Sequence, residues 1–352
     1  MAVLPKRPMP RVTMAVIAER AGVSRSTASF VINGRDKELK ISAETCRRVL
    51  DVVRELNYLP DVAARTLLGQ KTRTIGILWS LSGYNPIVGM VNSLTLMAAA
   101  NGYRTFLIDH LNDAKKTAAA LEDLASRRVD AIVMDADRHM LTDPKILALL
   151  RHFVAVVAVS NEPIKVPCDL VVHRRGPLYE QAARYLLRSG RRRLAIAMPD
   201  VANHDLKVDA VRNVLAEAGH SAERLIEIRF HVEFPGIDPL SGQERLVDAL
   251  EARFPDKMPF DALMCASDED AAYCVQWFQN KGMAIPDDMA IVGANDTLLG
   301  RILRPQLATG HRHNEGVSEA IRRFLFARLD NSLAAPQTAV IDMEFVCRKS
   351  AG

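Results

Sequence analysis

Short apolar runs rich in β-branched residues alternate with longer amphipathic stretches from about residue 74 onwards. The short runs predict buried strands at residues 75–79, 104–108, 131–134, 154–159, 170–172, 194–198, 226–230, 262–265, 290–292 and 340–346. The longer stretches predict helices at residues 86–100, 114–126, 179–187, 206–218, 242–253, 269–281 and 315–329. This alternation predicts an α/β body with parallel sheets and helices on both faces. About ten strands are more than one sheet usually holds, so we expect two lobes with a cleft between them.

The first sixty residues instead predict a small all-α domain. We expect helices at residues 14–20, 24–33 and 43–56. Thr13, Ser24 and Ser42 are the expected N-caps, because a hydroxyl at that position accepts hydrogen bonds from free first-turn amides. Gly22 permits a tight turn between the first two helices, and Gly34 ends the second with a positive φ. Two short helices joined in this way are typical of a helix-turn-helix motif, with a generic three-helix bundle as the alternative.

A short linker helix is predicted directly after this domain. Asp61 can cap a helix that Gly69 ends. A helix of about eight residues is shorter than the ~12–15 residues that an isolated helix needs for stability in water. We therefore expect it to form only when another surface packs against it.

Charge is distributed unevenly along the chain. Residues 1–73 hold 14 Lys and Arg against 7 Asp and Glu, a balance of +7, whereas the remaining residues hold 32 against 35, a balance of −3. A basic head on a nearly neutral body favours a polyanionic partner such as nucleic acid. A basic surface without a partner is the alternative interpretation.

Composition excludes several other classes of protein. The 352 residues are 49% hydrophobic and 25% charged, as in ordinary globular domains. No run of about 18 apolar residues predicts a transmembrane helix. Residues 1–11 lack the apolar core of a signal peptide, so we expect a cytoplasmic protein. The five cysteines are scattered without a CxxC pair, which argues against a disulfide framework or a zinc site. We expect no metal and no cofactor.

A set of short motifs is spread over almost the whole chain. In the head they are Val12-Thr13-Met14, Ala21-Gly22-Val23-Ser24, Asn33-Gly34, Leu56-Asn57-Tyr58-Leu59-Pro60 and Ala63-Ala64-Arg65-Thr66-Leu67. In the body they are Thr74-Ile75-Gly76-Ile77, Asn85-Pro86, Ser267-Asp268, Ile285-Pro286-Asp287-Asp288, Val292-Gly293 and Arg304-Pro305. Together these motifs resemble the lactose/galactose repressor family of transcriptional regulators.

The resemblance implies a sequence-specific DNA-binding regulator, most often a repressor, with a periplasmic-binding-protein-like body that binds a small-molecule effector between two lobes. It implies a basic tail at 1–11, a helix-turn-helix domain at 12–59, a hinge helix and linker at 60–73, a first lobe at 74–173 plus 311–332, and a second lobe at 174–310 plus 333–352. The lobes are then joined by crossovers near His173, Gly310 and residues 331–336. We expect a homodimer matched to a palindromic operator in double-stranded DNA, without the tetramerisation helix of the lactose repressor.

The family pattern assigns base reading to the second helix of the head. Arg25, Ser26 and Ser29 are expected at base edges in the major groove, where an arginine fork pairs with guanine. A contact of Arg25 with phosphate alone is the alternative. Phe30 stands where many relatives carry an arginine, so it either packs or touches a thymine methyl, and a different operator is expected. Phosphate contacts and caps are expected from Thr13, Ser24, Thr27, Asn33 and Tyr58.

The linker helix carries the remaining expected DNA contacts. Leu67 matches the leucine that relatives insert between the central base pairs, and Ala64 lies one turn before it. An apolar wedge unstacks one base step and bends the duplex in exchange for added contact. Core packing is the alternative role for a leucine in such a segment.

The expected effector site departs from the sugar-binding pattern of the family. Its candidate residues are Trp79, Tyr84, Asn85, His173, Lys207, Ser267 and Asn295. His173-Arg174 replaces a common Asp-Asn pair, and Lys207 takes the position of the family arginine. A sugar or sugar derivative with an anionic group suits Lys207, His173 and Arg174. The alternatives are that His173 and Arg174 are solvated residues at a crossover, or that the cleft binds nothing.

Two other function classes remain as alternatives. A free-standing solute receptor conflicts with the helix-turn-helix and with the lack of a signal peptide. The sequence gives no support for an enzyme, because the chain has no GxGxxG, GK[ST] phosphate loop, HExxH or GxSxG motif. The sequence names neither the effector nor the operator, and it does not fix the sign of regulation.

Overall fold

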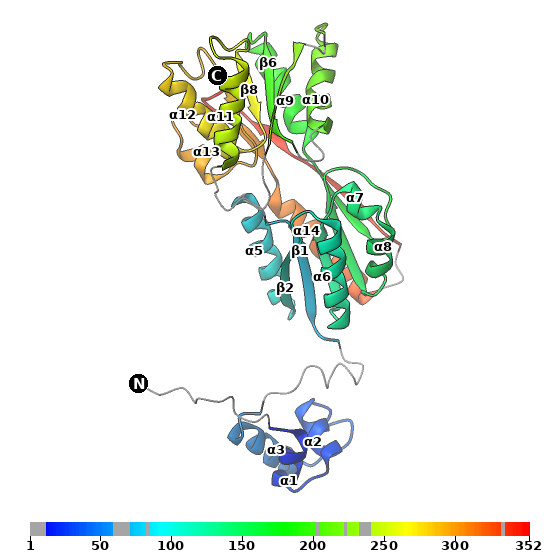
Figure 1. Ribbon diagram of the computed structural model, residues 1–352. Coiled ribbons are helices and arrows are strands. Elements are labelled where there is room, and N and C mark those ends of the chain that lie inside the picture. The colour runs from blue at the N-terminus through cyan, green and yellow to red at the C-terminus, as the bar shows by residue number, and fades with distance from the viewer. Residues whose placement is uncertain are drawn as a thin grey trace, which may run out of the picture. The chain divides into compact units, whose positions relative to one another are not determined.

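The computed structural model describes residues 12–58, 71–81, 85–200, 205–221, 224–231, 241–331 and 335–352, with the backbone alone at 85–87 and 241–242. The chain forms two compact units, Met1–Thr72 and Arg73–Gly352 (Figure 1). Each unit is described by itself. Within the described ranges, no helix is both long and apolar enough to cross a bilayer.

The first unit is a small helical domain. It contains α1 (Met14–Ala21), α2 (Arg25–Ile32) and α3 (Ala43–Glu55), each within two residues of its predicted bounds. Ile17, Ala18, Ala28 and Val49 are buried together at its centre. The small side chains of Ala18 and Ala28 let α1 and α2 approach closely. The helices therefore form a core of their own, as the predicted helix-turn-helix requires.

The turn between α1 and α2 depends on one glycine. Gly22 has a φ of 63°, a left-handed conformation that costs glycine little. Ser24 caps α2 by accepting the N–H of Thr27 at 3.1 Å, and Ser42 caps α3 in the same way. The prediction that the Thr13 side chain caps α1 is wrong. Thr13 precedes α1 with extended backbone, but its side chain makes no capping hydrogen bond.

The first lobe of the second unit is built on a parallel sheet. Its described strands are β1 (Thr74–Trp79), β2 (Arg104–Asp109), β3 (Ala131–Asp135), β4 (Ala155–Ser160), β5 (Asp169–Arg174) and β11 (Thr338–Asp342), in the order β11-β5-β4-β3-β1-β2. One face packs against α5 (Asn85–Ala100) and α14 (Asn314–Asp330). The other face packs against α6 (Ala114–Ser126), α7 (Arg138–Leu141) and α8 (Pro144–Leu150). Both faces are thus covered by helices, as the continuous apolar strands predict.

The second lobe has a smaller parallel sheet of its own. In the described part of the chain its strands are β6 (Leu194–Pro199), β7 (Ile226–Phe230), β8 (Ala262–Cys265) and β9 (Ala290–Val292), in the order β7-β6-β8-β9. It packs between α9 (Gly176–Arg188) with α10 (Asp205–Glu217) and α11 (Ser241–Arg253) with α12 (Asp268–Asn280). α13 (Leu298–Ile302) follows β9, and β10 (Thr309–His311) pairs antiparallel with β12 (Glu344–Val346).

Along the described residues, the chain passes between the lobes from β5 into α9, from β10 into α14 and from β11 into β12. The red segment of Figure 1 runs through both lobes at the last of these crossings. The expectation that residues 333–352 belong to the second lobe, with a crossover near 331–336, is therefore wrong for Thr338–Asp342. These residues pair with β5 in the first lobe. The apolar run at 340–346 predicted one strand, but it divides at Met343 between two sheets.

Candidate functional site

The N-terminal end of α2 presents polar side chains to solvent. Ser24, Arg25 and Ser26 are exposed, while Thr27 and Ser29 are half-buried. The Ser24 hydroxyl lies 2.8 Å from the hydroxyls of both Ser26 and Thr27. These contacts fix Ser24 as a structural cap and leave the exposed Arg25 guanidinium as the longest donor at this helix end.

Phe30 is half-buried on α2 and interacts with a cation from the following loop. The Arg35 guanidinium carbon lies 5.5 Å from the centre of the Phe30 ring, in the range of a cation–π contact. Arg35 also forms an ion pair with Glu38 at 2.9 Å. The ring therefore has a partner in Arg35 within the head, and its role toward DNA stays a prediction.

The other predicted contacts of the head have structural partners as well. The Asn33 amide donates to the Ser29 carbonyl at 2.8 Å, which satisfies the end of α2. Tyr58 is half-buried and packs against the core of the head. Thr13 is exposed before α1. Ala64 and Leu67 lie outside the described residues, so their roles stay predictions.

The predicted effector residues divide into core, cap and cleft positions. Trp79 is 4% exposed and packs in the core of the first lobe. Ser267 caps α12, since its hydroxyl accepts the N–H of Asp270 at 3.0 Å. Tyr84 lies outside the described residues, and Asn85 begins α5 with only its backbone described. His173, Lys207 and Asn295 belong to a separate group that lies where the chain crosses between the lobes.

Three cationic side chains come together in this region, of which Arg175 is half-buried. Arg175 follows β5, Lys207 lies on α10, and Arg312 follows β10. Lys207 and Arg312 are both buried. Burial, together with the charge of Arg175, lowers the pKa of Arg312 to about 9. Burial also lowers the pKa of Lys207 well below its usual range, with repulsion from Arg175 and Arg312 adding to the effect.

His173 lies beside these cations as a neutral side chain. It is 2% exposed, and burial lowers its pKa well below the ordinary value, with Arg312 and Arg175 contributing. Its ring is hydrogen-bonded to the backbone of Arg312, and its Nε2 has no partner among the described residues. Arg175 and Arg312 lower the pKa of both His173 and Lys207, so these two predicted effector residues lie near the same cations.

Arg174 does not belong to this group, contrary to the sequence-based expectation. Successive residues of a strand point to opposite faces, so His173 and Arg174 diverge. Arg174 donates two hydrogen bonds of 2.6 Å to the Asp342 carboxylate on β11. Arg175 joins the cations in its place, and neither it nor Arg312 was predicted. Arg175 could have been predicted, because residues two apart in a strand point to the same face, here that of His173. Nothing in the sequence indicated Arg312.

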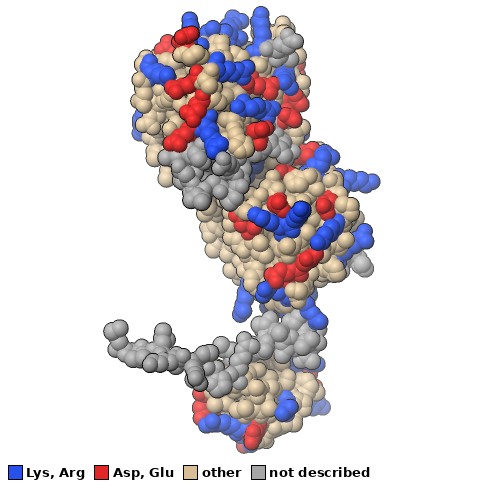
Figure 2. All heavy atoms as spheres, in the orientation of Figure 1, with Lys and Arg blue, Asp and Glu red and all other residues tan. Residues whose placement is uncertain are grey.

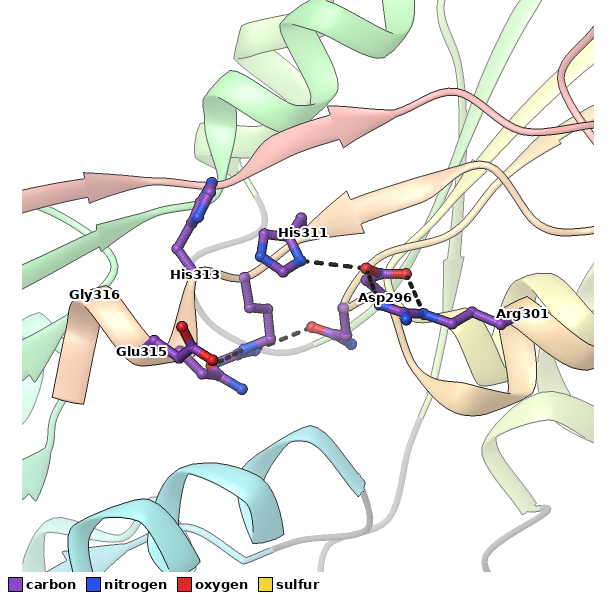
Figure 3. Close-up of a pocket in the computed structure, with 9 residues that line it drawn as sticks. Asp296, Arg301, His311, His313, Glu315 and Gly316 are labelled. Carbon is purple, nitrogen blue, oxygen red and sulfur yellow. Dashed lines mark hydrogen bonds and ion pairs between the residues drawn. The ribbon is translucent and has the colours of Figure 1, made fainter. Parts of the chain in front are cut away.

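A pocket of about 360 Å³ opens beside Arg312, where β10 leads into α14. Its lining includes Asn295, Asp296, Arg301, His311 and Arg312. Figure 3 shows His311 and Arg301 converging on Asp296, which also accepts from Arg348. Asp296 is thus neutralised by its neighbours, and the Arg312 guanidinium contributes a positive charge to the wall.

The outer surface of the second unit carries no comparable excess of positive charge on the face drawn. Figure 2 shows blue and red side chains interspersed over both lobes. The ion pairs Arg184–Glu217, Arg138–Glu162 and Arg322–Glu319 are examples of this mixing. The cluster of cations is therefore a local property of the crossover region.

Apolar side chains are exposed along one side of the second unit. Val88 and Leu96 on α5 are 65% and 63% exposed, and Leu298 and Ile302 on α13 are 73% and 61% exposed. Phe106 on β2 is also exposed. Figure 1 shows α5, β2 and α13 on the same side of the unit. Exposed apolar side chains that share one side of a domain favour a protein–protein contact.

Two protein-family models match the chain. The model described as bacterial regulatory proteins of the lacI family matches residues 13–61, and a model of the periplasmic binding protein-like domain matches residues 183–351. The first match covers the helical head and the second covers most of the second lobe together with the end of the first. Each match thus falls within one of the two compact units.

Curated relatives are similar over nearly their whole length. The chain is 28% identical over 338 residues to the HTH-type transcriptional repressor PurR of Mannheimia succiniciproducens, covering 96% of this chain and 98% of that protein. It is 26% identical over 342 residues to the ribose operon repressor of Haemophilus influenzae, with the same coverage. Both relatives are repressors by name.

Solved structures share the fold at lower identity. The Lac repressor dimer bound to operator and an anti-inducer aligns with a TM-score of 0.78 at 19% identity, covering 97% of this chain and 99% of that one. A transcriptional regulator from Silicibacter pomeroyi aligns with a TM-score of 0.80 at 18% identity and the same coverage. The order of head and two-lobed body is therefore common to all three.

Proposed function

Because the chain belongs to the lacI family of bacterial regulatory proteins, we propose that it is a transcriptional repressor whose operator affinity changes when a small molecule binds between its lobes. The observation that carries this proposal is the α1–turn–α2 geometry of the head. Gly22 makes the turn, Ser24 caps α2, and the exposed Arg25 stands at its first position. We place this activity in the cytoplasm, where chromosomal operators are found.

We assign base reading to the N-terminal half of α2. In helix-turn-helix proteins this part of the second helix enters the major groove. Arg25 is assigned to guanine, and Ser26 and Ser29 to neighbouring base edges. The hydroxyls of Thr13 and Thr27, with Asn33 and Tyr58, are assigned to phosphates, which fix the position of the head without reading sequence.

We propose that two copies act together through the exposed apolar side chains of α5, β2 and α13. A two-fold dimer presents two heads to the two halves of a palindromic operator. The Lac repressor in the similar structure is a dimer on its operator. A dimer also brings two hinge segments together, so that each short helix can gain the packing that it lacks alone.

The effector site is assigned to the crossover region with His173, Lys207 and Asn295. A ligand that contacts both lobes favours one relative arrangement of them, and so shifts the population that can bind DNA. Since the two heads must match a fixed spacing of half-sites, a small change between the lobes is enough to alter operator affinity.

The experiment that tests this function begins with selection of bound sequences from a random DNA library by the full-length protein. A palindromic consensus with two half-sites is the expected result. Arg25→Ala should then weaken binding to that operator by ~1–3 kcal/mol and relax the preference at one position per half-site. Arg54→Ala removes the same charge from α3 and is the matched control. Equal losses on specific and random DNA for Arg25→Ala would contradict its assignment as a base reader.

A further inference from the structure

Three cationic side chains from separate elements meet at the crossover between the lobes. The N-terminus of α9 packs against α10, because a Cβ placed on Gly176 would lie 3.7 Å from that of Ala210. This contact brings Arg175 next to the turn of α10 that carries Lys207. Arg312 reaches the same region, since the His173 ring bonds its backbone. Like charges held this close in the interior repel one another unless an anion lies between them.

Among the described residues, the side-chain hydrogen bonds of Arg312 go to neutral groups. Arg312 donates to the amide oxygen of Asn295 at 3.0 Å and approaches that of Asn314 at 3.4 Å. The Nε atom of Arg175 is buried and has no partner among the described residues. Two other arginines of this unit do have a carboxylate partner. Arg174 and Arg328 each donate two hydrogen bonds to one carboxylate.

The carboxylates near the cluster favour its charged forms through space, and they accept hydrogen bonds from other groups. Asp270 is hydrogen-bonded to Gln243 at 3.0 Å. Asp268 accepts from Thr297 and Thr309. Asp137 and Asp135 both favour the charged form of Arg175 through space. Asp137 accepts from the Asn112 amide at 3.1 Å, and Oδ1 of Asp135 accepts from the His110 ring at 2.7 Å and from the Ser80 amide at 3.0 Å. No carboxylate among the described residues makes a two-point contact with Arg175 or Arg312.

His173 adds a second kind of contact. Its Nε2 is the unpartnered ring nitrogen, so the nitrogen bonded to the Arg312 backbone is Nδ1. In a neutral histidine whose Nδ1 donates to a carbonyl, Nε2 is a hydrogen-bond acceptor. A buried acceptor without a donor costs free energy, and a hydroxyl of a bound ligand would satisfy it.

Resting on the proposed function, we propose that the effector is a hydroxylated organic anion, whose carboxylate or phosphate binds Arg175 and Arg312, with Lys207 beside them and a hydroxyl donated to His173. Arginine forks match the planar, two-oxygen geometry of both anionic groups. The adjoining pocket of about 360 Å³ has the size of a small-ligand site. A neutral hexose supplies the hydroxyls but no anionic group for Arg175 and Arg312.

The test uses the full-length protein and inorganic phosphate as the probe, at constant ionic strength against chloride. A saturable rise in melting temperature is expected, because a ligand that binds only the folded state stabilises it by mass action. Arg175→Gln and Arg312→Gln should each weaken phosphate binding at least tenfold. Arg174→Gln removes the same charge from the opposite face of the strand, where Arg174 pairs with Asp342, and this variant should bind phosphate as the wild type does.

A second measurement keeps the proposal falsifiable without any ligand. If Arg312 is an uncompensated buried charge, Arg312→Gln should melt at or above the wild-type temperature, whereas Arg328→Gln should melt well below it. A clear fall for Arg312→Gln would overturn the proposal. So would phosphate that fails to stabilise the wild type, or that stabilises Arg312→Gln equally, which would indicate an adventitious ion only.

Organic probes then separate the two anionic groups. Gluconate, glucose 6-phosphate, glucose and hexanoate are compared, so that charge and hydroxyls vary independently. Stabilisation by gluconate or glucose 6-phosphate beyond that by hexanoate supports the proposal and names the group, while stabilisation by glucose alone contradicts it. Operator binding is measured on the same samples. Loss of the anion effect with operator binding intact overturns this inference only, whereas failure to bind any palindrome overturns the proposed function.

Discussion

Asp169 and Arg328 form a two-point ion pair inside the first lobe, with Nη2 and Nε of the arginine 2.9 Å and 3.1 Å from the two carboxylate oxygens. The same carboxylate accepts the backbone N–H of Gln337 at 2.7 Å. Asp169 begins β5, Arg328 lies near the end of α14, and Gln337 directly precedes β11. One side chain therefore fixes two segments that follow it by 159 and 168 residues.

Asp169→Asn should destabilise the second unit strongly. The side chains of this pair are 1% and 11% exposed, so loss of one charge leaves the other buried and uncompensated. Removal of one partner of a buried pair costs ~3–5 kcal/mol. Urea unfolding followed by circular dichroism measures the loss. Asp123→Asn breaks the exposed pair with Arg127 and should leave the midpoint unchanged; equal effects of the two variants would refute the structural role of Asp169.

Leu67→Ala should lower affinity for the specific operator and spare binding to random DNA. The expected cause is loss of an apolar wedge between base pairs, which contributes only where the duplex is bent into the specific complex. Fluorescence anisotropy with both DNAs at one salt concentration measures the ratio. Leu39→Ala, which shortens an exposed leucine of the head, serves as the control. A parallel loss on both DNAs would remove the wedge role.

Phe30→Arg should change the operator preference instead of abolishing binding. A phenylalanine cannot donate a hydrogen bond, whereas an arginine at this position can pair with guanine at ~1–3 kcal/mol of discrimination. Selection of half-sites by the variant is expected to enrich guanine at one position where the wild type shows no such preference. Because Arg35 lies over the Phe30 ring, Phe30→Leu is the matched control for loss of that contact alone. Enrichment by both variants would contradict direct reading.

Asp270→Asn should alter the pH dependence of stability. Burial raises the pKa of Asp270 to about 6, and its Oδ2 has no partner among the described residues. The folded state therefore holds a proton that the unfolded state releases at about pH 3.8, so stability falls as the pH rises from there to about 6. The amide removes this loss. Its stability relative to wild type should increase between pH 4 and pH 7, by at most ~3 kcal/mol.

Chemical denaturation at several pH values gives this difference directly. Asp256→Asn, at an exposed carboxylate of the same lobe, should leave the profile unchanged. A constant gap between Asp270→Asn and wild type from pH 4 to pH 7 would mean that Asp270 titrates as it does in the unfolded chain.

Leu298→Glu with Ile302→Glu should convert a dimer to a monomer. Both side chains are exposed apolar groups on α13, and a dimer interface would desolvate the two new charges at high cost. Analytical ultracentrifugation measures the mass. Val340→Glu, at a half-exposed valine of β11, is the control and should stay dimeric. A dimer that survives the double substitution would place the interface elsewhere.

Most elements of the fold could be predicted because their hydrophobic periodicity is local. β7 and β8 coincide with their predicted ranges, and the helices of the head end within two residues of theirs. The short elements α7, α8, α13 and β10 were missed, since three to seven residues carry no measurable period. The run at 340–346 was assigned to one strand because nothing in its sequence marks Met343 as the point where the partner sheet changes.

The site was only half predictable, for a related reason. His173 and Lys207 were found as unusual residue types at positions where the family carries others. Arg174 was preferred to Arg175 because adjacency in sequence hides the alternation of a strand. The sequence did not predict Arg312 as a site residue. Its role depends on three segments that meet only in the folded chain and on the lack of a carboxylate partner among the described residues.

The late position of β11 has a consequence for synthesis of the protein on the ribosome. Domains generally fold from the N-terminus during translation. Here the edge of the first sheet next to β5 stays open until residues 338–342 have emerged, after β6 to β9 of the second lobe have been made. A nascent chain therefore exposes an unpaired strand edge, a template for intermolecular association, while residues 175–337 are being made. Premature termination after β9 would yield a finished second sheet beside an unfinished first one.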